Sequence, residues 1–199
     1  VQLTPLVAKD SVIIALSIHS NLLHTLDTSI SYLTSNSLIS IAQNCKNLKA
    51  LKITAEFGTH FSYNGAENPL VPGLTAVLED CCSLRNVIIR GNAIGYFTAN
   101  MKAVSSQVKS LDLGLNGESL IIVKRALAVF PSLNKLILKE CYDRKDDIVM
   151  YIAMNYPNLI ELELESFISL TKECLICLSE SCRKLRYLYI SEVDEACFS

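Results

Sequence analysis

Apolar residues recur along the chain in a nine-residue phrase whose fourth, seventh and ninth positions are mostly leucine, isoleucine or valine. The clearest copy spans residues 45–53, and related copies begin at residues 20, 81, 105, 130, 156 and 182. Five of the six intervals between these starting residues, which we call anchors, are 24 to 26 residues long, and the interval from 45 to 81 is 36. A fixed period of this length indicates stacked structural repeats.

Within each repeat the apolar period changes from that of a helix to that of a strand. Leu38, Ile41, Ala42 and Cys45 follow the i, i+3, i+4, i+7 spacing of one helix face. Leu51 and Ile53 then alternate with polar residues, as in a short strand. The same alternation follows at Val87/Ile89, Leu111/Leu113, Leu136/Leu138, Leu162/Leu164 and Leu188/Ile190.

Such a unit cannot bury its apolar side alone and must stack on its neighbours. The sequence therefore predicts one α/β domain over residues 1–199, a right-handed solenoid of about seven repeats of 25–26 residues. We expect a parallel sheet on the concave face and helices on the convex face.

The phrase C-x-x-L-x-x-L-x-L, with cysteine at Cys45, Cys81 and Cys182, resembles the leucine-rich repeat family. More narrowly, it resembles the cysteine-containing subclass found in F-box proteins. That resemblance implies a non-catalytic module for protein–protein interaction, the substrate-recognition solenoid of an F-box-type ubiquitin ligase receptor. An alternative is a leucine-rich repeat scaffold or regulatory protein unrelated to ubiquitin.

In F-box proteins a separate helical segment binds the ligase adaptor. Residues 1–10 are too few for such a segment, so any adaptor contact is expected through a part absent from this chain. Ile13 and Leu16 are expected to present apolar surface at the first repeat, as they would in a solenoid cut from a longer protein.

Composition narrows the class of partner and the compartment. Hydrophobic residues make up 50% of the chain, charged residues 19%, and the net charge is −2. This balance gives no electrostatic reason to expect nucleic acid or a membrane as a partner. The eight cysteines are not arranged as a disulfide framework, and the chain has no Asn-x-Ser/Thr glycosylation site. We therefore expect a cytoplasmic or nuclear protein.

No motif in the chain predicts a catalytic residue, a metal ligand set or a cofactor site, so we expect a protein that is not an enzyme. Cys174 and Cys177 form a C-x-x-C pair, but no second pair lies at zinc spacing. Asp143, Asp146 and Asp147 could bind a cation, yet the Gly and terminal Glu of a calcium loop are missing. A solvated loop leading into a helix capped by Asp146 or Asp147 is the better interpretation.

The repeat register also predicts a binding surface. Residues five, seven and nine positions after each anchor alternate with the buried ones, so their side chains are expected on the concave face. The expected partner-binding strip is Lys52, Asn86, Ile88, Arg90, Asp112, Lys135, Ile137, Lys139, Glu161, Glu163, Glu165, Tyr187 and Tyr189.

Charge on this strip is sorted along the repeats. The three glutamates are expected to face a basic segment of a protein partner, and the four cations an acidic one. The alternative is an ordinary solvated strand face.

Two further expectations concern the long repeat and the anchors. The extra residues of the 36-residue interval form an insertion at about 57–69, and Phe57, His60, Phe61 and Tyr63 are candidate partner contacts. A neutral, tolerated insertion is the alternative.

Cys45, Cys81 and Cys182 are expected to line the core as reduced thiols rather than to pair with one another.

Overall fold

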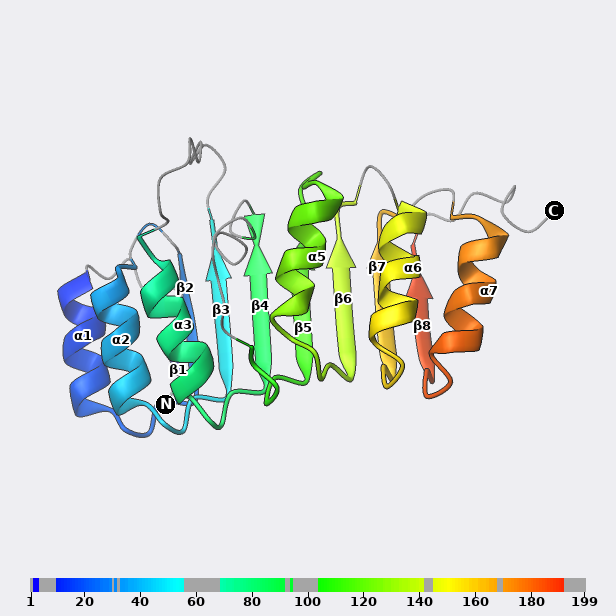
Figure 1. Ribbon diagram of the computed structural model, residues 1–199. Helices are drawn as coiled ribbons and strands as arrows, with labels where there is room; N and C mark the ends of the chain where they lie inside the picture. The colour runs from blue at the N-terminus through cyan, green and yellow to red at the C-terminus, as the bar shows by residue number, and fades with distance from the viewer. Residues whose placement is uncertain are drawn as a thin grey trace.

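The parallel sheet and its helices are arranged in two layers along the chain in a computed structural model (Figure 1). The structure describes residues 2–3, 10–29, 31, 33–55, 69–91, 94, 104–141, 145–167 and 170–191. Eight described strands lie side by side in the order in which they occur in the sequence. The described helices all cover one face of this sheet, so the opposite face, which we call the open face, carries no helix (Figure 1).

Each strand except the first contributes to one repeat. The strands are β1 (Gln2–Leu3), β2 (Thr25–Ser29), β3 (Ala50–Thr54), β4 (Asn86–Arg90), β5 (Ser110–Gly114), β6 (Lys135–Lys139), β7 (Glu161–Glu165) and β8 (Tyr187–Ile190). The helices are α1 (Asp10–His19), α2 (Ser35–Asn44), α3 (Val71–Asp80), α5 (Leu120–Ala128), α6 (Lys145–Asn155) and α7 (Lys172–Ser181). The protein is thus an α/β leucine-rich repeat solenoid, as its pattern predicts.

Side-chain hydrogen bonds fix the first turn of two helices, and anchor cysteines mark the last turn of three. The Thr34 hydroxyl accepts a hydrogen bond from the Ser37 N–H, and the Ser37 hydroxyl accepts one from the Thr34 N–H, which forms a reciprocal cap on α2. On α7 the cap is one-way, because the Thr171 hydroxyl accepts a hydrogen bond from the Cys174 N–H. Cys45, Cys81 and Cys182 are the C-cap residues of α2, α3 and α7.

The strand register confirms the repeat period. Lys135 lies opposite Ser110 on one side and Glu161 on the other, and each of these residues is five positions after its anchor. The long repeat keeps the same register, because Ala50 pairs with Asn86. The ten extra residues therefore leave the stacking of β3 on β4 unchanged. The insertion itself, with Phe57, His60, Phe61 and Tyr63, lies outside the described residues.

The core lies between the sheet and the helices. The alternating strand residues and the helix residues that face them are 0–2% exposed in most repeats, including Leu51, Leu111, Leu136 and Leu162. The two repeats with the weakest pattern are equally well packed, since Leu23 and Val108 are 1% and 0% exposed. Burial of this kind is the main source of stability in a solenoid.

The anchor residues share a property that hydrophobicity alone does not explain. The Cys81 thiol lies 3.9 Å from the Cys45 carbonyl oxygen, and the Cys182 thiol 3.4 Å from that of Tyr156. The Tyr156 hydroxyl donates to the Leu127 carbonyl at 2.5 Å. The Ser105 hydroxyl donates to the Leu78 carbonyl at 3.3 Å. Cysteine, serine and tyrosine anchors can thus each donate to the preceding repeat, which accounts for these three residue types at one position. Phe130 is the anchor without a donor group.

Two observations at the first repeat differ from expectation. Ile13 is 3% exposed and belongs to the core, and Leu16 is half-buried, so the expected apolar surface at these residues was wrong. The pattern also did not predict β1, whose two residues pair in parallel with Thr25 and Leu26 of β2. Among the described residues no helix is both long and apolar enough to cross a membrane.

Candidate functional site on the open face of the sheet

The open face is built by alternate residues of β2 to β8, as the register predicts. Because the odd positions of each strand face away from the helices, their side chains form three rows that run across the sheet. The middle row contains Asp27, Lys52, Ile88, Asp112, Ile137, Glu163 and Tyr189, each in register with the next.

Exposure along these rows is uneven. Asn86 is exposed, whereas Ile88 and Ile137 are half-buried and Asp112 is only 8% exposed. The largest exposed side chains are Tyr187 and Tyr189, at 49% and 45%. Apolar contact area is therefore concentrated on β8 and does not extend evenly along the strip.

The charged residues of the strip bind one another across neighbouring strands. The Lys52 ammonium lies 2.9 Å from the Asp27 carboxylate, and Lys139 pairs with Glu165. Arg90 contacts both carboxylate oxygens of Asp112, with 2.5 Å between Nη1 and Oδ1. Every cation that the sequence assigned to the strip has a carboxylate partner on an adjacent strand.

Lys135 differs from the other cations because it serves two carboxylates. Its ammonium lies 2.9 Å from both Glu161 and Glu163. The hydrogen bonds that the Lys135 ammonium donates to these two glutamates raise the pKa of Lys135, so the group stays charged throughout the physiological range. Burial raises the pKa of the Asp112 carboxyl, while the charge of Arg90 opposes that rise.

These pairs revise the expectation that the glutamates and the cations each face an opposite charge on a partner. The strip neutralises most of its own charge, so its charged groups first fix the arrangement of neighbouring repeats. The sequence contains a pattern that predicts these ion pairs. Opposite charges stand at equal offsets from successive anchors, as at Lys139 and Glu165, and in parallel repeats equal offsets lie side by side.

We predict that replacing Glu165 with lysine lowers the free energy of unfolding by about 1 kcal/mol, because it places two cations opposite each other on β6 and β7. Exchanging both partners, Lys139→Glu with Glu165→Lys, should restore most of the loss. Urea unfolding of both variants measures the difference. If the exchanged variant were as unstable as the single one, the pairing would not be the cause.

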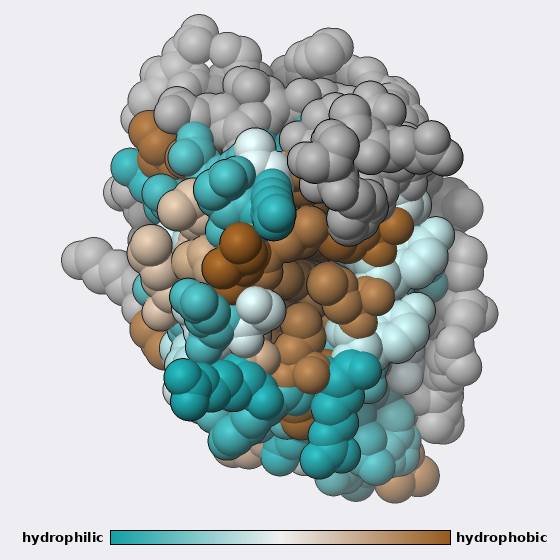
Figure 2. All heavy atoms as spheres, turned by 90° about the vertical axis from the view of Figure 1, so that its right-hand side faces the viewer, coloured by the Kyte–Doolittle hydropathy of each residue, from teal (hydrophilic) through white to brown (hydrophobic). Residues whose placement is uncertain are grey.

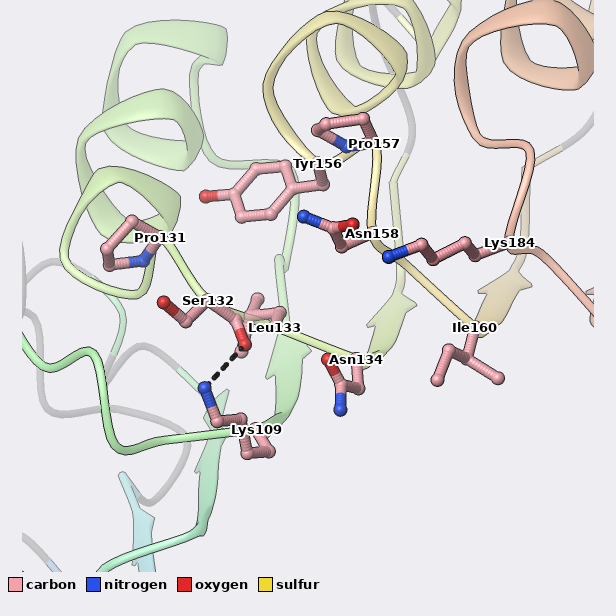
Figure 3. Close-up of a pocket in the computed structure, with 10 residues that line it drawn as sticks. All are labelled: Lys109, Pro131, Ser132, Leu133, Asn134, Tyr156, Pro157, Asn158, Ile160 and Lys184. Atoms are coloured by element: carbon pink, nitrogen blue, oxygen red, sulfur yellow. Dashed lines mark hydrogen bonds between the residues drawn. The ribbon is translucent and has the colours of Figure 1, made fainter.

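A pocket lies at a different place, along the edge where β6 and β7 begin (Figure 3). It has a volume of about 420 Å³, and Lys109 and Lys184 approach it from opposite sides with Asn134 and Asn158 between them. The Lys109 ammonium donates to the carbonyl oxygens of Ser106 and Ser132 at 3.0 and 3.3 Å. Its lining contains no carboxylate, histidine or thiol, so it offers no acid–base pair or nucleophilic cysteine.

The other candidate groups are structural in the described part of the chain. Asp146 accepts hydrogen bonds from the Thr171 N–H at 3.1 Å and hydroxyl at 2.6 Å, so it supports the start of the next helix, α7, and does not cap its own. Burial raises the pKa of Asp146, but these hydrogen bonds outweigh it and hold that pKa below its ordinary value. Cys174 is buried and Cys177 half-buried, and no described group of three potential ligands could hold a metal ion.

No model of a known protein family and no curated protein matches the chain. Among solved structures it is similar to the C-terminal domain of tropomodulin from Caenorhabditis elegans, with 15% sequence identity and a TM-score of 0.38. The match covers 89% of this chain and 93% of the tropomodulin domain.

Proposed function

We propose that this protein is a non-catalytic interaction module that binds another protein on the open face of its sheet. The observation that carries the proposal is the contrast between the two faces. The described helices lie over one side only, whereas the other side exposes two tyrosines and two half-buried isoleucines beside groups whose charge is mostly balanced by ion pairs. Exposed aromatic side chains on a rigid, pre-organised surface are typical of binding hot spots.

The internal ion pairs favour a binding surface over a catalytic one. Catalysis needs a free base, acid or nucleophile near the reacting atoms, whereas these carboxylates and ammonium groups are held by one another. A partner that covers the face need not neutralise each charge itself. When a partner removes these carboxylates and ammonium groups from water, each charge still has its opposite charge beside it, which lowers the desolvation cost of association.

We further propose that the module is the substrate-recognition part of an F-box-type ubiquitin ligase receptor acting in the cytoplasm or nucleus. Support for this narrower proposal comes from the C-x-x-L-x-x-L-x-L phrases at Cys45, Cys81 and Cys182. The ligase adaptor would bind a segment outside this chain, and a leucine-rich repeat scaffold without a link to ubiquitin is the alternative.

The binding face is tested with Ile137→Lys. Ile137 lies between Asp112 and Glu163 in the middle row, so a lysine there meets two carboxylates and should leave the fold intact while blocking the centre of the face. We expect at least tenfold weaker capture of the same partner proteins by the full-length protein, as for a hot-spot change. Ile121→Lys is the matched control, because Ile121 is 63% exposed on α5 of the opposite layer.

The same captures decide the ubiquitin link. Recovery of a ligase adaptor and cullin by both variants, with loss of the remaining partners only in Ile137→Lys, supports the receptor function. Capture without any ligase adaptor favours the scaffold. Equal loss of partners in both variants would reject the open face as the binding surface.

A further inference from the structure

The β6–β8 end of the open face carries more negative charge than its cations neutralise. Glu161 and Glu163 share the single ammonium group of Lys135, and Glu165 has Lys139 to itself. Three carboxylates therefore meet two ammonium groups, and one negative charge remains. Elsewhere on the face, Asp27 and Asp112 each have a cation of their own.

The two most exposed aromatic residues of the face lie directly beside this excess charge. Tyr187 is in register with Glu161, and Tyr189 with Glu163. Adjacent strands are about 4.8 Å apart, so each ring lies next to the carboxylate opposite it. Neither tyrosine hydroxyl forms a hydrogen bond with a described residue, and the rings are about half-exposed.

Solvation alone is a poor account of these tyrosines. Tyrosine is enriched in binding hot spots, because its rigid ring buries a large area at a low cost in conformational entropy. Within β8, whose sequence is YLYI, no charged side chain stands between the two rings. Figure 2, seen from the β8 side of the described structure, shows hydrophobic side chains gathered in the centre of the view. Leu188 is 44% exposed, but it alternates with the two tyrosines and therefore belongs to the helix side of β8.

Charge complementarity restricts what can bind here. An acidic group would be repelled by the excess carboxylate, and a purely apolar group would remove that carboxylate from water without a partner. An arginine side chain fits both the tyrosine ring and the excess carboxylate. Its planar guanidinium stacks on the ring and donates hydrogen bonds to the carboxylate at the same time.

The neighbouring cations locate the site along β8. Arg183, Lys184 and Arg186 lie in the turn that leads into the strand and repel a cation near its first residue. Glu165 and Glu163 lie towards the other end. The favoured position is therefore over Tyr189 and Glu163.

We propose that Tyr189 and Glu163, flanked by Tyr187 and Glu161, form a recognition site for an arginine side chain of the protein partner. This inference rests on the proposed binding function of the open face and specifies the chemistry of its ligand. We call these four residues the arginine site.

The test uses defined peptides and needs no natural partner. The isotope-labelled chain is titrated with an eight-residue peptide of alternating glycine and arginine, with its termini blocked, and followed by NMR. We expect saturable shifts at the backbone amides of β7 and β8. A matched peptide with citrulline, which has the shape of arginine without its charge, should bind at least several-fold more weakly, and a glycine–glutamate peptide should not shift these signals.

Variants separate the site from general attraction to a slightly acidic protein. Tyr189→Leu and Glu163→Gln should each weaken the arginine peptide about two- to fivefold, the change expected for an exposed cation–π or ionic contact. Tyr189→Phe should keep the affinity, because the ring is retained. Asp27→Asn, a carboxylate at the far end of the same face, and Tyr151→Leu, a tyrosine of α6, are the matched controls and should change little.

Equal binding of the citrulline peptide, or equal affinity in Tyr189→Leu and Asp27→Asn, would overturn the arginine site. Chemical-shift spectra of each free variant establish that it is folded. The outcome is distinguishable from failure of the proposed function, which is judged by loss of protein capture in Ile137→Lys. If Ile137→Lys loses its partner proteins but the arginine and citrulline peptides bind the unmodified protein equally well, the open face remains the binding surface and only the arginine site is rejected.

Discussion

Replacing Cys81 with aspartate should abolish cooperative folding of the solenoid at neutral pH. Cys81 is 0% exposed and lies against the carbonyl oxygen of Cys45, and burial raises the pKa of its thiol to about 12. A carboxylate at this position would have no ion-pair partner among the described core residues and only the charge of Lys46 nearby, which does not offset burial, so burying it costs several kcal/mol. Since a whole domain is stable by only about 5–15 kcal/mol, and each repeat is stabilised by its neighbours, the loss should spread along the array.

The adjacent residue supplies a matched control. Cys82 is exposed, so Cys82→Asp should unfold at nearly the same urea concentration as the unmodified protein. Circular dichroism during urea unfolding measures both variants. A sharp, native-like transition in Cys81→Asp would contradict the buried position of the anchor.

Thiol labelling tests the same arrangement without mutation. In the native protein Cys82 should react rapidly with a thiol reagent, whereas Cys45, Cys81 and Cys182 should react only on unfolding, because protonated and buried thiols are poor nucleophiles. Rapid native labelling of these three anchors would disprove their place in the core.

Replacing Arg90 with methionine should produce the second largest loss, about 2–3 kcal/mol of unfolding free energy at pH 7. Arg90 forms a bidentate ion pair with Asp112, whose side chain is only 11% exposed. The substitution keeps the length of the aliphatic stem but leaves a nearly buried carboxylate with only the more distant charge of Lys139. The cost comes from that uncompensated charge.

The loss should depend on pH in a defined direction. Burial already raises the pKa of Asp112, and removing Arg90 raises it further, above its value of about 3.9 in the unfolded chain. A raised carboxyl pKa destabilises the fold at pH values above it, and this penalty is relieved as the pH falls towards the unfolded value. The difference between variant and parent should therefore shrink from pH 7 towards pH 4.

Lys52→Met is the control for this comparison. Lys52 is 38% exposed and pairs with Asp27 through one contact, so its removal should cost at most about 1 kcal/mol. Urea unfolding at several pH values measures both variants. Equal losses, or a loss for Arg90→Met that does not change with pH, would contradict the buried pair at β4 and β5.

Sequence patterns predicted which residues lie on the open face better than they predicted the contacts among those residues. The offsets from the anchors assigned Lys52, Glu163 and Tyr189 to the same face, and the strand register places them in one row. The patterns did not reveal that Asp112 is nearly buried, or that Lys135 serves two glutamates. Those facts depend on the distances between side chains of different repeats, which a one-dimensional pattern does not contain.

By itself, then, the sequence determined the period, the alternation of helix and strand, and which residues of each strand face the core. These features are local, because the spacing of apolar residues along a helix or strand directly sets the face that they occupy. Tertiary structure alone decided that Asp146 supports α7, that Ile13 joins the core, and that the charges of the open face pair across strands. Each of these outcomes requires groups about 25 residues apart to come within a few ångströms, which happens only when the repeats have stacked.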